Sequence, residues 1–343
     1  MKFYEITIKP TSGFGTPIKG DTLFGHFCWQ AANNDSLLNG KFEDYISIYC
    51  QKPFAIFSSA FPKIEFPETC YVLKRPDMPE PLKKSKDENN INLQEKIKKF
   101  EQRKQDKKKK WMVVKKSLTI NPAKAEFISD KELFEKQLDP KIHRIGKEHP
   151  EKFMISFSQP HNTINRLTNT TGTGMFAPYI KDNFYYLNDI KLAIFVLIDE
   201  SAIDIEKIAK GLERIGKWGY GRDASTGLGK FSIESKTELT FPDTKNFNAC
   251  YSLSPCVPEK DCFSISYFSP FVRFGKHGDI LSNSKNPFKN PVIMADEGSV
   301  FKPINKDFFN KPYLGRAVQG VSKSMEETVV QGYSPYLPIK LEN

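Results

Sequence analysis

The fold is decided by IKLAIFVLIDESAIDIEKIAKGLERIGKWGYGRDASTGLGKFSIES, positions 190–235. Ile190–Ile198 is a nearly continuous apolar run, which is typical of a strand in the middle of a covered sheet. Ile203–Ile215 then carries isoleucine and leucine at spacings of three and four, which predicts a helix with one buried stripe. The glycine loop, Gly216–Lys230, separates this helix from an alternating strand at Lys230–Ser235. This part of the chain therefore reads strand, helix, glycine loop, strand.

The start of the chain repeats the strand-and-helix unit. Phe3–Lys9 alternates apolar and polar residues, which predicts a strand that buries one face. A turn-rich stretch follows at Pro10–Pro17, and then Asp21 stands ahead of a helical pattern, where an aspartate is a good N-cap. The apolar stripe of this helix consists of Leu23, Phe24, Phe27 and Ala31.

Joined together, the two units give the order βα…βαβ. This order predicts an α+β fold in which a ferredoxin-like (RRM-like) sandwich, with four strands and two helices on one face, occupies residues 1–240. A large insertion lies at about residues 40–185, and a second, strand-rich domain is expected at 241–343. Further candidate elements are strands at Phe54–Ser58, Cys70–Lys74, Trp111–Leu118, Ser264–Phe268, Ser299–Lys302 and Leu337–Ile339, and a helix at Asn92–Lys110.

Composition limits the class of protein. The chain has 343 residues, no apolar run long enough for a transmembrane helix and no apolar core of a signal peptide at its start, so we expect a cytoplasmic protein without membrane contact. The six cysteines form no Cys-x-x-Cys pair, and a cytosolic chain of this size needs no disulfide. The even spacing of Cys250, Cys256 and Cys262 is too wide for a typical zinc site, so buried thiols are expected instead.

The basic character is local. Between Lys83 and Lys116 there are 14 basic and 5 acidic residues, so this segment supplies +9 of the formal net charge of +10. A charge run of this kind is usually a solvated insert, and it can also serve as a flexible arm that attracts phosphates.

The glycine loop holds five glycines among fifteen residues. Glycine permits positive φ and lets a phosphate approach backbone amides. Lys217, Arg222 and Lys230 add charge, while Trp218 and Tyr220 offer aromatic faces for bases. Because the helix precedes the loop, phosphate-binding loops of the Walker and dinucleotide types are excluded. The structural alternative is a turn that lets the helix pack closely on the sheet.

A second candidate segment, His161–Phe176, is rich in threonine and asparagine and contains no carboxylate. Neutral donors and acceptors beside His161 and Arg166 suit an anionic, ribose-bearing ligand, although such loops are often solvated hairpin tips. Gly13–Thr22 is the third candidate, with a close glycine turn as its alternative.

Catalysis has little support in these motifs. His26 lies among aromatic residues, where a packed or capping histidine is the favoured interpretation, and His161 has no visible acid–base partner. Asp21 and Asp223 stand singly, whereas a metal nuclease needs clustered carboxylates. No cofactor or metal is expected.

The order of three motifs resembles the Csm subunit-four family, of the RAMP superfamily of CRISPR proteins in type III-A effector complexes. The motifs are Thr11–Pro17 with Asp21–His26, then His161–Arg166, then the glycine loop. The resemblance implies two ferredoxin-like domains and no catalysis. It also implies capture of the 5′ tag of the CRISPR RNA, with contacts to the large polymerase-like subunit and the backbone subunit.

The candidate RNA-binding residues come from the three segments. They are Phe14, Lys19, Asp21, His161, Asn162, Asn165, Arg166, Lys217, Trp218, Gly219, Tyr220, Gly221, Arg222, Ser225, Thr226, Gly227, Gly229 and Lys230. Two other functions stay open. One is a metal-independent endoribonuclease that uses His161 as acid or base, and the other is an assembly protein without RNA contact.

Overall fold

The computed structural model describes residues 1–65, 67–79, 97, 104–106, 108–137, 152–172, 174–187 and 189–342. The elements before residue 190 are β1 (Lys2–Pro10), α1 (Gly20–Ala32), η1 (Asp35–Leu37), α2 (Phe42–Ser47), β2 (Ala55–Ile64), β3 (Cys70–Lys74), β4 (Trp111–Lys115), β5 (Glu126–Ile128), α4 (Asp130–Gln137), β6 (Met154–His161), η4 (Gly174–Phe176) and β7 (Tyr179–Tyr186). Those that follow are β8 (Lys191–Ile198), α5 (Ile205–Trp218), η5 (Ala224–Thr226), β9 (Phe231–Leu239), β10 (Ala249–Ser252), β11 (Phe263–Tyr267), β12 (Pro270–Arg273), η6 (Asp279–Asn283), β13 (Val292–Ala295), β14 (Val300–Pro303), η7 (Lys306–Asn310), β15 (Tyr313–Gly315) and β16 (Tyr333–Ile339).

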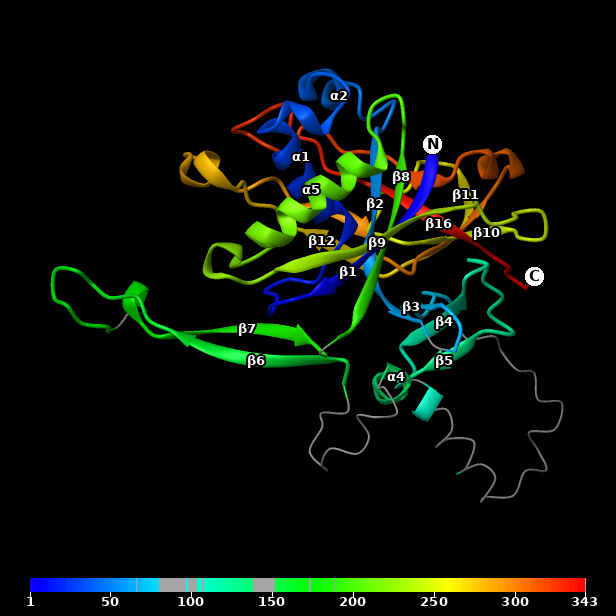
Figure 1. The fold of residues 1–343 in the computed structure, drawn as a ribbon, viewed down its shortest axis with the longest axis horizontal. Coiled ribbons are helices and arrows are strands. Elements are labelled where there is room, and N and C mark those ends of the chain that lie inside the picture. The colour runs from blue at the N-terminus through cyan, green and yellow to red at the C-terminus, as the bar shows by residue number, and fades with distance from the viewer. Residues whose placement is uncertain are drawn as a thin grey trace.

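A seven-stranded sheet in the order β5-β4-β3-β2-β8-β1-β9 organises the first 240 residues. The four strands β2, β8, β1 and β9 are antiparallel neighbours, α1 follows β1, and α5 follows β8. The two helices contact each other, and they pack against β2 and β9 respectively (Figure 1). The predicted order βα…βαβ is confirmed, and so is the central place of β8. The predicted stripe of α1 is buried, from Leu23 to Ala31.

The expectation that β1 buries only one face is wrong. Glu5 and Thr7 are as buried as their apolar neighbours Tyr4 and Ile6. The Glu5 carboxylate lies 2.8 Å from Lys63 Nζ and accepts a hydrogen bond of 2.5 Å from the Tyr71 hydroxyl. A charge on a fully covered strand is tolerated because these partners replace the water that Glu5 loses.

The segment predicted as an insertion, about residues 40–185, contains strands of two sheets. β2 pairs with β8, and β3, β4 and β5 continue the same sheet beyond β2, so much of the segment predicted as an insertion pairs with the N-terminal strands. β3 and β4 match the predicted strands, and β6 and β7 form a separate two-stranded hairpin that extends away from the body of the molecule (Figure 1). Most of the predicted helix at Asn92–Lys110 and most of the basic segment Lys83–Lys116 lie outside the described residues.

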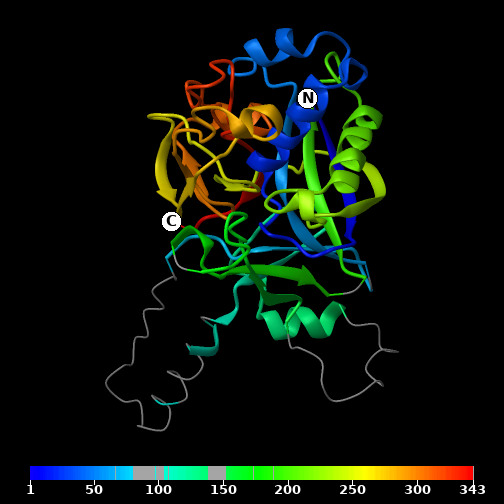
Figure 2. The ribbon, with the colours of Figure 1, turned by 90° about the vertical axis from the view of Figure 1, so that its left-hand side faces the viewer.

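The C-terminal part carries a five-stranded antiparallel sheet in the order β11-β14-β10-β16-β15. The strand-rich character and the strands predicted at 264–268, 299–302 and 337–339 are confirmed. Residues 240–342 are all described and contain no α-helix, and two ferredoxin-like domains are not confirmed. This part lies along one side of the N-terminal elements (Figure 2), and a continuous apolar core joins the two, including Tyr251 and Leu337.

Two absences are limited to the described part of the chain. None of its helices combines the length and apolarity that crossing a membrane requires. No cluster of histidine, cysteine and carboxylate side chains there has the arrangement of a metal site, and all six cysteines are free thiols.

Candidate nucleic-acid interface

The glycine loop is docked on the loop that follows β1. The amide of Gly229 donates to Gly13 O at 2.7 Å, and the amide of Thr11 donates to Lys230 O at 2.9 Å. The Lys230 amide also donates to the Ser12 hydroxyl at 2.8 Å. Two of the three predicted segments, far apart in the sequence, thus form one continuous backbone surface.

Most glycines of the loop are required for this close packing of the loop on its neighbours. Four of them have positive φ, from +74° at Gly221 to +111° at Gly219. A Cβ would lie 2.1 Å from Tyr220 O if added at Gly229, and 2.1 Å from Phe231 O if added at Gly216. Gly216 is the position where α5 meets β9, so the close-packing alternative holds there. Gly227 has φ of +97° with open space around it, so its backbone is accessible.

Tyr220 does not offer a face for stacking bases. Its side chain is 0% exposed, and its hydroxyl accepts a hydrogen bond from the Lys19 amide at 3.0 Å and donates to Pro17 O at 3.1 Å. The Tyr220 hydroxyl bonds to backbone groups of the loop after β1, and these bonds hold the ring inside the protein.

His26 lies beneath the loop as a hydrogen-bond acceptor. Its Nε2 receives the amide of Gly221 at 3.0 Å, and its ring lies 5.1 Å from that of Tyr220. Burial lowers the pKa of His26 to about 4, so the ring is neutral at pH 7 and available as an acceptor. The interpretation of His26 as a packed histidine is confirmed.

Lys19 and Asp21 are both engaged inside the protein. Lys19 Nζ lies 2.5 Å from Asp296 Oδ1 and 2.7 Å from Glu297 Oε2. Asp21 does not cap α1, because the N-cap residue is Lys19 and its side chain makes no capping bond. The Asp21 carboxylate instead binds Arg273, at 2.5 Å to Nε and 2.9 Å to Nη2. Neither side chain is therefore free to contact a phosphate.

The base of the β6–β7 hairpin is the third part of the surface. Phe14 is fully buried, its backbone pairs with that of Phe184, and their rings stack at 6.1 Å. The Arg222 guanidinium donates to Asp182 O and to Asn183 Oδ1. Asp223 receives Lys181 at 2.6 Å, so the single carboxylate of the glycine loop is neutralised internally. Phe14 and Arg222 thus hold the three segments together.

The outer side of the glycine loop carries the side chains that stay accessible. Trp218 is 73% exposed, and Ser225, Thr226 and Lys230 are exposed as well. Lys217 is exposed but pairs with Glu213 at 2.8 Å. Lys230 makes no ion pair with any residue of this loop, all of which is described. The glycine loop therefore presents an aromatic face, Trp218, near its start and an available cation, Lys230, at its end.

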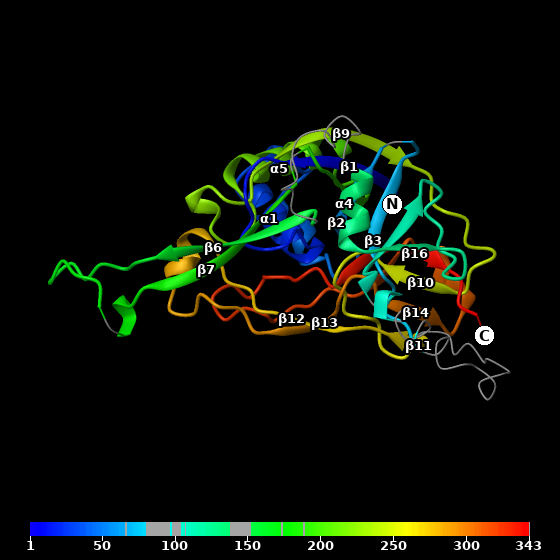
Figure 3. The same ribbon diagram turned by 90° about the horizontal axis from the view of Figure 1, so that it is seen from below.

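The predicted residues of the polar segment lie elsewhere. His161 ends β6, opposite Tyr179, and its ring stacks on that side chain at 5.5 Å. Asn162 and Arg166 are exposed beyond it, and Asn165 closes the tip through a backbone pair with Thr170. Figure 3 shows the hairpin tip far from α1 and α5. The structure therefore does not bring this segment to the glycine loop; only the hairpin base reaches it.

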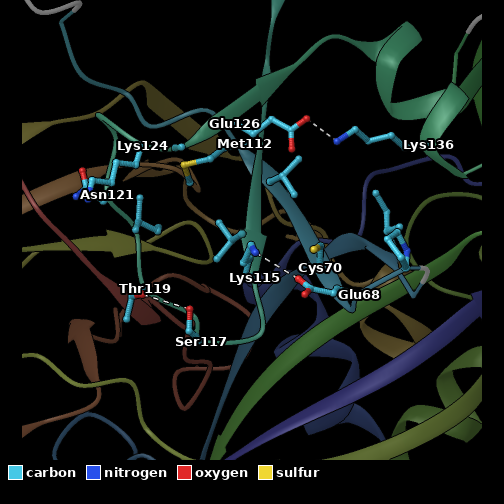
Figure 4. Close-up of a pocket in the computed structure, with 16 residues that line it drawn as sticks. Glu68, Cys70, Met112, Lys115, Ser117, Thr119, Asn121, Lys124, Glu126 and Lys136 are labelled. Carbon is cyan, nitrogen blue, oxygen red and sulfur yellow. Dashed lines mark hydrogen bonds and ion pairs between the residues drawn. The ribbon is translucent and has the colours of Figure 1, made fainter.

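A cavity of about 760 Å³ opens in the insertion, between β3, β4 and the segment that leads to β5 (Figure 4). Its lysines are largely paired, Lys115 with Glu68 at 3.3 Å and Lys136 with Glu126 at 2.5 Å. The cavity is distinct from the docked loops, and its third lysine, Lys124, is exposed.

Residues that complete the site were missed from the sequence. Arg273, Asp296 and Glu297 lie more than 250 positions from Asp21 and Lys19, and no local pattern links them. Asn183 stands in a strand that the sequence did not indicate. Only a long-range pairing signal could have identified these contacts.

The architecture defines a class of protein. It is a mixed α/β fold with mostly antiparallel sheets and few helices, which is consistent with the RAMP fold that the motifs resemble.

Solved structures of two kinds share this fold over the whole chain. One is a chain of a Csm1–Csm4 cassette in complex with pppApA, with a TM-score of 0.51, 17% identity and 100% of each chain covered. Another is a chain of a Csm3–Csm4 subcomplex in the type III-A CRISPR–Cas interference complex, with a TM-score of 0.50, 17% identity, and 99% and 100% of the two chains covered. A cassette with cA4 matches at a TM-score of 0.51 and 15% identity, again with 100% of each chain covered.

The resemblance stated from the motifs is thereby confirmed at the level of the fold. No protein-family model matches the sequence, and neither does any curated protein.

Proposed function

We propose that this protein is an RNA-binding subunit of a type III-A CRISPR interference complex. The observation that carries the proposal is the joined surface of the glycine loop, the loop after β1 and the hairpin base, which presents Trp218 and Lys230 outward while its own carboxylate is neutralised. The fold likeness to chains of Csm1–Csm4 and Csm3–Csm4 assemblies supports the same setting.

The RNA that this surface holds is the 5′ repeat-derived tag of the CRISPR RNA. The chain bridges the large polymerase-like subunit and the backbone subunit in a cytoplasmic, hetero-oligomeric complex. Its sheet β2-β8-β1-β9 with α1 and α5 is a ferredoxin-like unit, and the sheet after residue 240 is a second, reduced unit of the same kind. A strand-based platform with loops at one end is a common way to hold single-stranded RNA.

The subunit holds RNA without cutting it. His26 is occupied by the Gly221 amide, and its low pKa makes it a poor proton donor at neutral pH. The ring of His161 is stacked on Tyr179, and no hydrogen-bond partner within the described residues orients its Nε2. In a metal-free incubation with labelled repeat RNA we expect no cleavage. Specific cleavage that disappears in His161→Ala would favour the endoribonuclease instead.

The test of RNA holding uses Trp218→Ala/Lys230→Ala in the complex co-expressed with its large and backbone subunits. Both side chains are exposed, so the variant keeps the fold. Loss of one stacked base and one phosphate contact weakens RNA binding by roughly 30-fold or more. The measurement is the guide RNA that remains per complex after a salt wash, together with the Kd of reloaded RNA.

Lys210→Ala is the matched control, because Lys210 is an exposed lysine of α5 outside the glycine loop. It removes the same charge and should leave the Kd within about twofold of the unaltered complex. If both variants weaken binding equally, RNA responds to overall charge only and the surface is not its site. Unchanged binding in the double variant favours the assembly protein without RNA contact.

A further inference from the structure

β12 and β13 form a two-stranded ribbon that stands apart from both large sheets. We call residues 270–295 the ribbon. Val272 pairs with Ile293, and the pairing continues through the Gly275–Lys289 backbone hydrogen bond and the bridge between Lys276 and Phe288. Figure 3 shows β12 and β13 on the side of the molecule opposite β9, with α1 between them.

The inner face of the ribbon is fixed to the start of α1. Arg273 reaches Asp21, whose side chain is almost fully buried. Lys19 Nζ lies 4.5 Å from the centre of the Phe271 ring, and the Lys19 amide donates to the Tyr220 hydroxyl. Lys19 therefore contacts both the ribbon and the glycine loop.

The outer face of the ribbon is apolar and open. Opposite residues of an antiparallel pair point to the same side, so Val272 and Ile293 share this face. Ile293 is 72% exposed, Phe274 is 74% exposed and Phe288 is 67% exposed. Monomeric proteins rarely leave two phenylalanine rings this accessible on one ribbon without a ligand for them.

The charge of the ribbon indicates the kind of ligand. Residues 270–295 contain four basic residues and one acidic residue, Asp279; Arg273 is paired with Asp21 and Lys289 is partly buried, so Lys276 and Lys285 are the exposed cations. Lys276 Nζ lies 5.6 Å from the centre of the Phe288 ring, so cation and aromatic face alternate on the surface. This complement suits a partner that carries negative charge together with flat apolar groups.

Single-stranded RNA, with its phosphates and unpaired bases, fits this description better than a protein partner does. Lysine is depleted at the core of protein interfaces, whereas basic residues interleaved with aromatic rings are the standard platform for unpaired bases.

We propose that the outer face of the ribbon is a second contact for single-stranded RNA, in which Phe274 and Phe288 stack on bases and Lys276 binds the phosphate backbone. The proposal rests on the proposed function and deepens it, because it extends the RNA path from the glycine loop across the Lys19 connection onto the C-terminal half.

The test measures the affinity of the assembled complex, stripped of its own guide, for a fluorescein-labelled single-stranded RNA of the guide's length. Phe274→Ala/Phe288→Ala should weaken binding by roughly 100-fold, since the loss of each stacked ring is worth about tenfold. Phe274→Trp/Phe288→Trp keeps the stacking faces and should restore it. Lys276→Gln should lower the slope of log affinity against log salt by about 0.7, as expected for one phosphate contact to a single strand.

Ile293→Ala is the matched control, because it removes an equally exposed apolar side chain that has no aromatic face. It should leave the RNA affinity unchanged. If Ile293→Ala and the phenylalanine variants instead impair retention of another subunit while RNA binding persists, the ribbon is a protein docking face and the proposal is overturned.

The same experiment separates this proposal from the proposed function. If Trp218→Ala/Lys230→Ala weakens RNA binding and the ribbon variants do not, the ribbon proposal alone fails. If the unaltered complex binds no single-stranded RNA, both fail together.

Discussion

Asp21 lies in the first turn of α1, and its carboxylate is used by Arg273, 252 positions further along the chain. A helix cap and a buried ion pair at Asp21 would contribute different amounts to the free energy of unfolding. A capping aspartate contributes about 1 kcal/mol, whereas removal of one partner from a buried ion pair costs about 3–5 kcal/mol.

We expect Asp21→Ala to lower the free energy of unfolding by about 3 kcal/mol, because it leaves the Arg273 guanidinium without its partner. Arg273→Met in the same chain should recover most of that loss. Chemical denaturation of the two single variants and the double variant measures the coupling. A loss near 1 kcal/mol that is independent of Arg273 would return Asp21 to the role of a cap.

Gly229 tests the close approach between the two loops. Its φ is +75°, and an added Cβ would meet the backbone of Tyr220 at 2.1 Å. Gly229→Ala should therefore destabilise the protein by at least about 2 kcal/mol. Gly25→Ala is the control, since nothing lies within 4 Å of its Cβ position in α1, and it should stabilise by up to about 1 kcal/mol. Equal effects in thermal unfolding would contradict the tight docking of the glycine loop.

His26 gives a pH dependence with a definite sign. Burial lowers its pKa to about 4 in the folded state, against about 6.5 in the unfolded chain, so the unfolded chain binds more protons between these values. Stability is lost as the pH falls through this window, by up to about 3 kcal/mol. His26→Gln keeps an acceptor for the Gly221 amide without titrating, and it should lack this loss.

The quantity to measure is the difference in unfolding free energy between the unaltered protein and His26→Gln from pH 7 to pH 4. The Glu297 carboxyl contributes in the opposite sense, because burial raises its pKa to about 6, but it is present in both proteins and cancels. A difference that stays flat across the window would show that His26 is solvated.

At the scale of elements, hydrophobic periodicity predicted those helices and strands whose burial follows from their own apolar pattern. β8 and α5 have apolar patterns that match their burial, and both were predicted within two residues at most ends. β1 was predicted as a strand, but the burial of Glu5 depends on Lys63 and Tyr71 from other strands. The alternation of apolar and polar residues within one strand carries no information about partners on other strands.

The strands β6 and β7 were not predicted, because they are only partly buried, although a solvated hairpin tip was one interpretation of the polar segment between them. Apart from the bridge between Phe14 and Phe184, its strands pair only with each other in the described structure. We therefore expect its outer part to be dispensable for folding.

Replacement of residues 162–178 by Asn-Gly joins His161 to Tyr179, which already face each other, through a two-residue turn. The unfolding free energy should change by no more than about 0.5 kcal/mol, as for other surface changes. If Asn162 and Arg166 contact RNA, the guide RNA should dissociate faster from the shortened variant in competition experiments. Unchanged dissociation removes the tip residues from the RNA path.

At the scale of the whole molecule, the sequence located the glycine loop and the loop after β1 but could not show which of their side chains face outward. Tyr220, Lys19 and Arg222 were predicted to contact RNA, and each is held by partners from a distant segment. Trp218 and Lys230 are exposed, whereas three of the four glycines between them lie against neighbouring atoms. Burial of this kind is decided by tertiary packing, which residue type alone does not reveal.

The central claim is that the joined surface holds the 5′ tag of a guide RNA. The most direct measurement is to sequence the RNA that co-purifies when the chain is co-expressed with the large and backbone subunits and a CRISPR array. We expect RNA of defined length with one uniform, repeat-derived 5′ end, and loss of that RNA in Trp218→Ala/Lys230→Ala but not in Lys210→Ala. Heterogeneous cellular RNA without a common 5′ end, or a stable complex that contains no RNA, would contradict it.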